Sequence, residues 1–362
     1  MNGNTLARVP RPHDIDAAWL TDILAGQGHD WDIAGFTMES VGTGQLGDTL
    51  RLTLRYGARQ GPETIVGKFA AESQDSRDAA AANNLYAREV GFYRDLAGRA
   101  RISTAACYGA ALADDGSFVL LLEDCAPART GDQIAGITAA QANASMVEAA
   151  RLHAAFWDRG DAPELAWLDT GEQGAPPLSQ PFYPAEALRG AWPEFRDRHA
   201  DNLTAEMIRV CDRFCERYEG YNAAPSRPRC VTHNDYRPDN MLFLGDESLK
   251  VVDWQSAALG FNAVDVSYLI GGAFAPGVRR DAEAGLLGAY HDELLRQGVT
   301  GYARADFEED YRRFTFAGIN VAVCAAMSVQ RTERGDRLFL TMLDRHVSHV
   351  VDTGALAILD AG

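Results

Sequence analysis

The chain shows two hydrophobic periodicities, one typical of strands and one typical of helices, and each dominates a different part of its length. This separation restricts the fold more than any other feature of the sequence. Up to residue 124 the patterns are typical of strands, except for helical patterns at Asp14–Leu24 and 76–98. Strand patterns cover 32–42, 49–57, 63–71, 105–112 and 117–123. Beyond residue 125 helical periods cover 138–158, 203–221, 263–273, 279–297, 304–329 and 335–358, with short strands near 229–232, 241–244 and 248–253. This segregation predicts a bilobal α+β fold: an N-terminal antiparallel sheet lobe with one main helix (1–124) and a larger, mostly helical C-terminal lobe (125–362).

Composition limits the classes of partner. A chain of 362 residues with 46% hydrophobic and 23% charged residues can bury a core in each of two lobes. Its formal charge of -17 disfavours nucleic acid, because phosphate backbones attract basic surfaces. No apolar run has the length of a signal peptide or membrane span, and the six cysteines are too scattered for a disulfide framework. We therefore expect a cytoplasmic protein with reduced thiols and no membrane partner, as a monomer or homodimer.

The residues between 231 and 255 carry the clearest chemistry. His233, Asp235 and Asn240 follow the pattern H-x-D-x4-N, and Asp253 comes directly after the apolar pair Val251-Val252. Phosphoryl transfer from ATP needs one carboxylate to orient the attacking hydroxyl, and an amide oxygen and a second carboxylate to hold Mg²⁺. This set predicts the catalytic centre of a kinase.

A glycine pattern precedes the first alternating strand. Gly42, Gly44 and Gly47 match G-x-G-x-x-G and run directly into the strand pattern at 49–57. A strand, a glycine turn and a second strand are the arrangement in which backbone N–H groups cover nucleotide phosphates in kinases. A plain glycine hairpin or a dinucleotide-binding fingerprint are the alternatives, although the latter needs a helix after the glycines.

Other nucleotide contacts are predicted around this loop. Lys68 interrupts an apolar strand, and a buried ammonium needs an anionic partner, for which Glu89 in the helical segment is the candidate. The alternative is that Lys68 points to solvent and Glu89 is a surface residue. Glu123 and Cys125 follow a buried strand at the lobe junction, where backbone groups would contact the adenine.

The segment 159–200 is rich in proline, glycine and aromatic residues. Its aromatic residues are Trp167, Phe182, Tyr183, Trp192 and Phe195. Two interpretations remain open: a substrate-binding lid, or an insert packed onto the lobe for its own stability.

In this order the motifs resemble the aminoglycoside phosphotransferase and choline kinase superfamily, most closely its ecdysteroid-kinase-like (CHK-like) branch and bacterial relatives. The resemblance rests on the glycine loop, Lys68, Glu89, the junction Leu121–Asp124, Leu152–Trp157, His233–Asn240 and Asp253–Gln255. It implies a protein-kinase-like fold that transfers the γ-phosphate of ATP to a small-molecule hydroxyl. It further implies that Asp235 is the catalytic base, that Asn240 and Asp253 bind Mg²⁺, and that Lys68 contacts phosphate with Glu89 as its partner.

Departures from protein kinases narrow the expected substrate. Gln255 replaces the glycine of Asp-Phe-Gly and no Ala-Pro-Glu segment follows, which disfavours a protein substrate.

Arg237 could neutralise the transferring phosphoryl group or form an ion pair with Asp239 or another nearby acid. Asp265 is expected to have a structural role, as a helix cap or a brace for the catalytic loop. The acceptor stays open among an aminoglycoside, an amino alcohol, a sugar and an apolar alcohol. A pseudokinase that binds nucleotide as a regulator is the alternative function.

Overall fold

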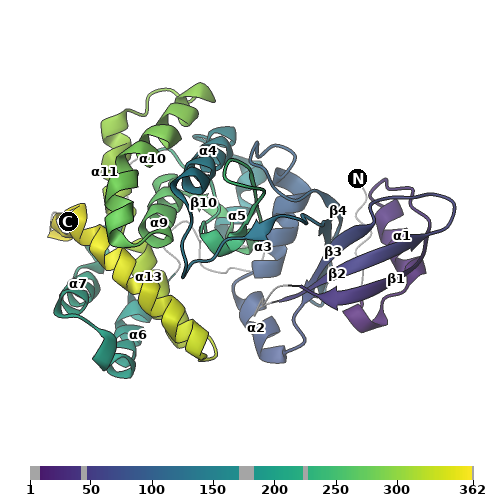
Figure 1. Ribbon diagram of the computed structural model, residues 1–362, viewed down its shortest axis with the longest axis horizontal. Coiled ribbons are helices and arrows are strands. Elements are labelled where there is room, and N and C mark those ends of the chain that lie inside the picture. The colour runs from purple at the N-terminus through teal and green to yellow at the C-terminus, as the bar shows by residue number, and fades with distance from the viewer. Residues whose placement is uncertain (1–8, 42–46, 171–182, 223–226, 361–362) are drawn as a thin grey trace.

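The protein has two unequal parts, an antiparallel sheet at one end and a larger group of helices at the other (Figure 1). The computed structural model describes residues 9–41, 47–170, 183–222 and 227–360. The predicted α+β class is confirmed, with the sheet N-terminal and the helical part larger. The division between residues 124 and 125 stays a prediction, because one hydrophobic core runs from the sheet's inner face into the helices.

Five antiparallel strands form the sheet in the order β1-β2-β3-β5-β4. Their bounds are β1 Ile33–Ser40, β2 Gly47–Tyr56, β3 Thr64–Ala70, β4 Cys107–Leu112 and β5 Phe118–Glu123. Alternation in β5 serves two cores, since Val119 and Leu121 face helix α1 (Ala17–Ala25), whereas Leu120 and its neighbours face the helical part. Helix α1 begins later than predicted, because Asp16 caps it by accepting a hydrogen bond from the backbone N–H of Trp19.

The helix predicted at 76–98 is three elements. Helix α2 (Gln74–Ala82) ends at Asn83, helix α3 (Leu85–Gly91) follows, and a π-helical turn, η2 (Phe92–Leu96), completes the segment. Asn84 lies in the left-handed region at φ 53°, a conformation that asparagine tolerates better than most residues. The break turns α3 so that its buried face carries Glu89 beneath the sheet.

The C-terminal part follows the predicted helices with breaks, and it adds two helices within 159–200. Its longer helices are α4 (Ala139–Ala155), α6 (Ala185–Arg198), α7 (Ala205–Glu216), α9 (Ala263–Ala273), α10 (Pro276–Arg296), α11 (Arg304–Phe314), α12 (Ala317–Ser328) and α13 (Glu333–Asp352). The shorter ones are α5 (Trp167–Thr170), α8 (Tyr218–Asn222) and α14 (Leu356–Asp360). The single helices predicted over 203–221, 304–329 and 335–358 are each divided in two. The last division comes at Gly354, which has φ 63°.

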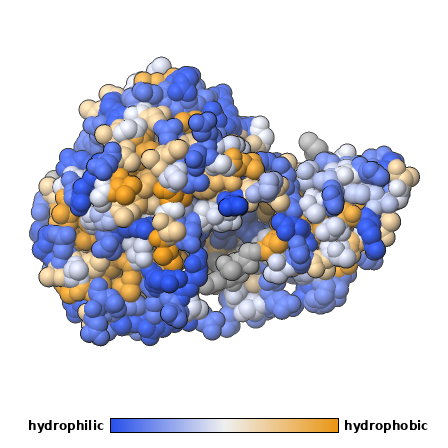
Figure 2. Space-filling model, in the orientation of Figure 1, coloured by the Kyte–Doolittle hydropathy of each residue, from blue (hydrophilic) through white to orange (hydrophobic). Residues whose placement is uncertain are grey.

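Two small sheets of short strands lie in the C-terminal part, around the residues of the predicted catalytic motifs. Strand β8 (Met241–Phe243) pairs with β9 (Leu249–Val251) and with β6 (Arg129–Thr130), and β7 (Cys230–Thr232) pairs with β10 (Ala258–Gly260). The surface is indented between the sheet and the helical part (Figure 2). Among the described residues, no helix combines the length and the apolar character that a membrane crossing requires.

Candidate active site

Lys68 lies at the centre of the predicted site. On β3, Ile65 and Phe69 belong to the outer core with α1, so strand alternation turns Lys68 towards α3. Its ammonium lies 2.7 Å from a carboxylate oxygen of Glu89 and 2.7 Å from Oδ1 of Asp253. The alternative in which Lys68 points to solvent is therefore wrong. The contact with Asp253 joins residues 185 positions apart and was not predicted.

Burial and charge act against each other in this triad. Burial alone would lower the pKa of Lys68, but the charges of Asp253 and Glu89 raise it above its ordinary value. Burial raises the pKa of Glu89 despite the nearby ammonium. Burial also acts to raise the pKa of Asp253, but Lys68 outweighs it and the pKa is lowered. Lys68 thus stays charged, and Asp253 stays ionised beside it.

The β8–β9 hairpin brings Asn240 close to Asp253. Beyond the last strand pair, the N–H of Val252 donates to the carbonyl oxygen of Asn240 at 3.0 Å, so Asn240 lies opposite the residue before Asp253. Asp253 has φ 67° and ψ 64°, in the left-handed region that side chains other than glycine seldom adopt. Such strain persists where surrounding contacts hold it, here the ion pair with Lys68.

Asp235 is surrounded by hydrogen-bond donors. The amide nitrogen of Asn240 donates to its Oδ2 at 2.8 Å, Nε of Arg237 donates at 3.1 Å, and the phenol of Tyr268 donates to its Oδ1 at 3.4 Å. Arg237 also contacts Asp239 at 2.9 Å, which is the ion pair that the sequence offered as the alternative to a phosphoryl contact. Burial opposes the charge of Arg237, yet Asp235 raises its pKa, so the guanidinium keeps its charge beside the proposed base.

Asp265 braces the catalytic loop from the first turn of α9. Its two carboxylate oxygens accept the backbone N–H groups of His233 at 2.7 Å and Asn234 at 2.8 Å. His153 lies 3.1 Å from the same carboxylate, and all of these groups are buried. Of the two structural roles expected for Asp265, the brace is present.

The imidazole of His233 is part of the loop's own framework. Its Nε2 donates to the carbonyl of Val252 at 3.0 Å, and its Nδ1 accepts the N–H of Asp235 at 3.3 Å. This places one ring between Asp235 and the residue before Asp253. A structural role for His233 agrees with these contacts.

Both acidic side chains at the strand–loop junction are paired. Glu123 contacts Lys250 of β9 at 2.5 Å, and Asp124 contacts Arg51 of β2 at 2.6 Å. Burial raises the pKa of the Cys125 thiol, which keeps it protonated. The ion pairs occupy the carboxylates of Glu123 and Asp124, and the nucleobase contact predicted at Glu123 and Cys125 stays a prediction.

Gly47 is the one described member of the glycine pattern; Gly42 and Gly44 lie outside the described residues. Gly47 begins β2 beside Lys68, and a Cβ there would come within 3.7 Å of Cε of Lys68 and 3.0 Å of the carbonyl of Phe69. Strand β1 pairs antiparallel with β2, so a strand follows the glycines. A dinucleotide fingerprint is wrong, because it requires a helix at that point.

A stacked pair that the sequence did not predict joins η2, directly after α3, to the Asp253 segment. The ring of Phe92 lies 3.6 Å from that of Trp254 at an interplanar angle of 5°. The indole N–H of Trp254 donates to Thr104 at 3.0 Å, and a guanidinium nitrogen of Arg88 donates to the carbonyl of Ala257 at 3.1 Å. Helix α3, and with it Glu89, is thereby fixed against the residues that follow Asp253.

Comparison with known proteins agrees with this geometry. Residues 53–307 match APH, the phosphotransferase enzyme family. The chain belongs to this family. No curated protein sequence matches it.

Solved phosphotransferases share its fold at low sequence identity. A putative aminoglycoside phosphotransferase from Ralstonia eutropha JMP134 is 17% identical with a TM-score of 0.54, covering 95% of this chain and 97% of that one. A GDP complex of wild-type aminoglycoside 2′-phosphotransferase-IIIa is 15% identical with a TM-score of 0.50, covering 92% and 99%. At these identities the likeness shows the fold alone.

The donor set of this family member fits a magnesium ion. The amide nitrogen of Asn240 is engaged by Asp235, which leaves its side-chain oxygen as the ligand atom beside the carboxylate of Asp253. No cluster of three or more His, Cys, Asp or Glu residues suited to a metal occurs in the part of the chain that is described. Mg²⁺ needs few protein ligands, because it keeps waters and binds substrate phosphates.

The segment 159–200 is in part a packed helix, which the sequence did not predict. Trp192 and Phe195 are buried on α6, whose interior contains Pro193. Tyr183 is anchored to α12, since its N–H donates to Asn320 at 3.1 Å and its carbonyl accepts from Tyr218 at 2.5 Å. These contacts favour the packed insert for residues 183–200; Phe182 and the rest of 171–182 lie outside the described residues.

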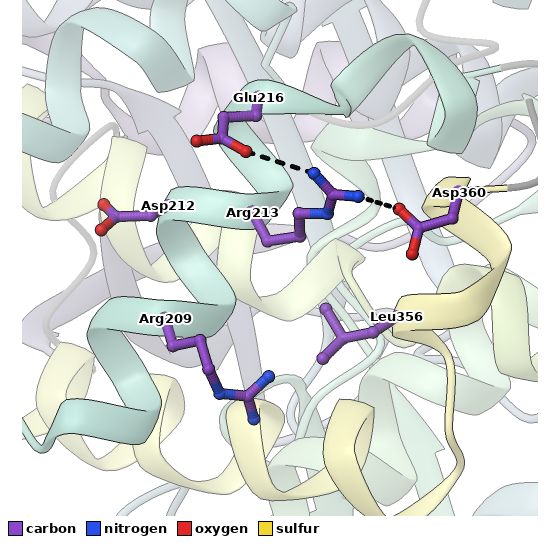
Figure 3. Close-up of a pocket in the computed structure, with 6 residues that line it drawn as sticks. All are labelled: Arg209, Asp212, Arg213, Glu216, Leu356 and Asp360. Carbon is purple, nitrogen blue, oxygen red and sulfur yellow. Dashed lines mark hydrogen bonds and ion pairs between the residues drawn. The ribbon is translucent and has the colours of Figure 1, made fainter.

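A surface hollow is lined by residues of α7 and α14 (Figure 3), and none of the candidate site residues lines it. Arg213 lies between Glu216 and Asp360 and forms ion pairs with both. Arg209 is paired with Glu206 at 3.7 Å. Both cations are matched by carboxylates, so this hollow has no excess charge with which to bind a phosphate.

Proposed function

We propose that this protein is an ATP-dependent kinase that transfers the γ-phosphate to a hydroxyl group of a small molecule. The observation that carries the proposal is the contact of Lys68 with both Glu89 and Asp253, 2.7 Å from each carboxylate. It joins a phosphate-contacting cation of the sheet to a candidate metal ligand of the helical part. Membership of the APH family supports the same chemistry.

Each residue then has a separate task. Asp235 accepts the proton of the acceptor hydroxyl and orients its oxygen for in-line attack on the γ-phosphorus. Arg237 offsets negative charge on the transferring group, and Lys68 holds the α- and β-phosphates with Glu89 fixing its direction. Asn240 and Asp253 would hold Mg²⁺, which supplies charge neutralisation at the phosphates when bound.

The proposed acceptor is a small molecule rather than a protein. Gln255 in place of glycine after Asp253-Trp254 supports this, as it did from the sequence. The ecdysteroid-kinase-like branch remains our proposal for the nearest relatives, and an acceptor with apolar surface is favoured over a polycation.

A coupled screen tests the proposal. We expect wild-type protein with Mg·ATP to release ADP only with an acceptor, in a library of aminoglycosides, amino alcohols, sugars and sterol-like alcohols. Asp235→Asn should lower kcat with the best acceptor about 1,000-fold, because the base is lost. Asp344→Asn, on the exposed face of α13, is the control and should leave kcat unchanged.

Two outcomes would contradict the kinase. If Asp235→Asn matched the wild type, the assigned base would be wrong. If ATP bound without transfer to any acceptor class, a nucleotide-binding regulator would explain the site better.

A further inference from the structure

Tyr268 touches the proposed base from the side opposite to the metal ligand. It lies on α9 with 2% of its surface exposed, and its phenol donates to Oδ1 of Asp235 at 3.4 Å, while Asn240 holds Oδ2 at 2.8 Å. The carboxylate is thus bound at both oxygens by neutral donors from different elements. Burial, followed by the charge of Asp235, raises the pKa of Tyr268 well above its usual range, so the phenol stays a donor.

His346 supports the ring of Tyr268 from behind. The two rings are stacked, with centroids 5.6 Å apart and an interplanar angle of 18°. Three glycines make room for the imidazole, because a Cβ on Gly318 would lie 2.2 Å from it, and Cβ atoms on Gly271 and Gly272 would lie 2.5 and 3.1 Å away. The slot therefore combines α9, α12 and α13 around one side chain.

The polarity of His346 is not used in this slot. It is fully buried, and among the described residues neither ring nitrogen has a hydrogen-bond partner. Burial, with the nearby His349, Arg345 and Arg279, lowers its pKa well below the ordinary value, so the ring is neutral. A neutral ring in such a closed slot acts through its shape, which fixes the plane of Tyr268.

We propose that Tyr268 is a positioning residue for phosphoryl transfer, which fixes the carboxylate of Asp235 and is itself held in place by His346. The inference rests on the proposed function. Its physical reason is that a base must keep one lone pair aimed at the acceptor hydroxyl, and displacements of about 1 Å at a reacting group cost up to about 100-fold in rate. Without Tyr268, Asn240 and the Nε of Arg237 would still hold the carboxylate, but Oδ1 would lose its one neutral donor and the carboxylate could turn more easily about its Cβ–Cγ bond.

Tyr268→Phe removes only the phenol oxygen. We expect kcat to fall about tenfold with KM for ATP and for the acceptor unchanged, because the loss concerns the direction of the base. Tyr302→Phe is the matched control: it removes another buried phenol that donates to an aspartate, Asp310, at 2.7 Å, away from the site. Equal kcat losses in the two variants would overturn the inference.

A double-mutant cycle tests the part of His346. His346→Ala should lower kcat about fivefold. In a Tyr268→Phe background it should lower kcat no further, because His346 acts on Asp235 only through the phenol of Tyr268. His291→Ala, which removes another buried imidazole, should lower stability without this coupling. Multiplicative losses from Tyr268→Phe and His346→Ala would show that His346 acts independently and would contradict its role.

A measurement without turnover separates this inference from the proposed function. In protein carrying ¹³C-labelled aspartate, Asp235→Asn identifies the carboxyl signal of Asp235. We expect Tyr268→Phe, but not Tyr302→Phe, to move that signal, whether or not an acceptor is known. An unmoved signal would overturn the inference while leaving the kinase intact; a moved signal without any turnover would contradict the kinase alone.

Discussion

The two halves of the candidate site are held together by different forces. On the nucleotide side, Lys68 forms ion pairs with two carboxylates, and the side chains are 16% exposed for Lys68, 1% for Glu89 and 28% for Asp253. On the acceptor side, Asp235 is held by Asn240, Tyr268 and Arg237, so two of its three donors are neutral.

The difference predicts two kinds of failure. Removing one charge of a buried set leaves the others uncompensated, so substitutions on the nucleotide side should cost stability as well as activity. Removing one neutral donor leaves a carboxylate that is still solvated and partly held, so substitutions on the acceptor side should change rates first. The following predictions test this contrast.

The largest effect is expected from Lys68→Met. Glu89 and Asp253 would then lie close together without a cation, which should lower the free energy of unfolding by about 3–5 kcal/mol. Urea denaturation near pH 8 measures this, and KM for ATP should rise. Arg59→Met, which breaks the exposed ion pair with Asp30, is the control and should change stability little.

A double variant sharpens the first prediction. Lys68→Met combined with Glu89→Met should recover part of the stability lost in Lys68→Met, since an apolar pair carries no buried charge. No recovery would mean that packing, rather than charge, holds α3 beneath the sheet.

An intermediate effect is expected from Asp265→Asn, which acts on the acceptor side through the backbone. The new amide would face the N–H of His233 or Asn234, leaving one buried donor without an acceptor at a cost of about 1–3 kcal/mol. We expect the loss in kcat, expressed as a free energy, to exceed the loss in the free energy of unfolding. The reason is that Asp235 directly follows the two backbone N–H groups that Asp265 holds. Differential scanning calorimetry measures the loss of stability, and steady-state kinetics measures the loss of kcat, with Asp344→Asn as the control. A loss of stability larger than the loss in kcat would contradict this prediction.

The smallest effect is expected on stability when the pH is lowered. Burial lowers the pKa of both His346 and His349 below the ordinary 6.5, so the unfolded chain takes up protons first as the pH falls. The contribution of the two neutral rings is fully present above pH 6.5 and is lost below it, by at most about 1.4 kcal/mol per pH unit for each ring.

Denaturation midpoints at pH 7.5, 6.5 and 5.5 measure this slope. His346→Ala should flatten it, and the exposed His13→Asn should leave it unchanged. A slope that is the same in His346→Ala and the wild type would show that His346 does not titrate differently on folding.

Local sequence patterns predicted much of the secondary structure, because the spacing of apolar residues reflects which side chains are buried. Alternation in 49–57 identified β2, since every second side chain enters a core, and the continuous apolar run in 117–123 identified β5, whose two faces enter two cores. The pattern missed α6, where Pro193 and nearby glycine and proline residues suggest a loop although packing of Trp192 and Phe195 holds a helix. The helical pattern also failed to separate α2 from α3. A single residue in the left-handed conformation, Asn84, leaves the helical spacing of apolar residues almost intact.

By itself the sequence determined the chemistry available here: a lysine in an apolar strand, and His233, Asp235, Asn240 and Asp253 at spacings suited to phosphoryl transfer. Only the tertiary structure decided which of these groups meet. The contacts of Lys68 with Asp253, Phe92 with Trp254, and Tyr268 with Asp235 and His346 join distant segments. Burial gives such pairs their strength, and no local period records which distant segment will cover a given side chain.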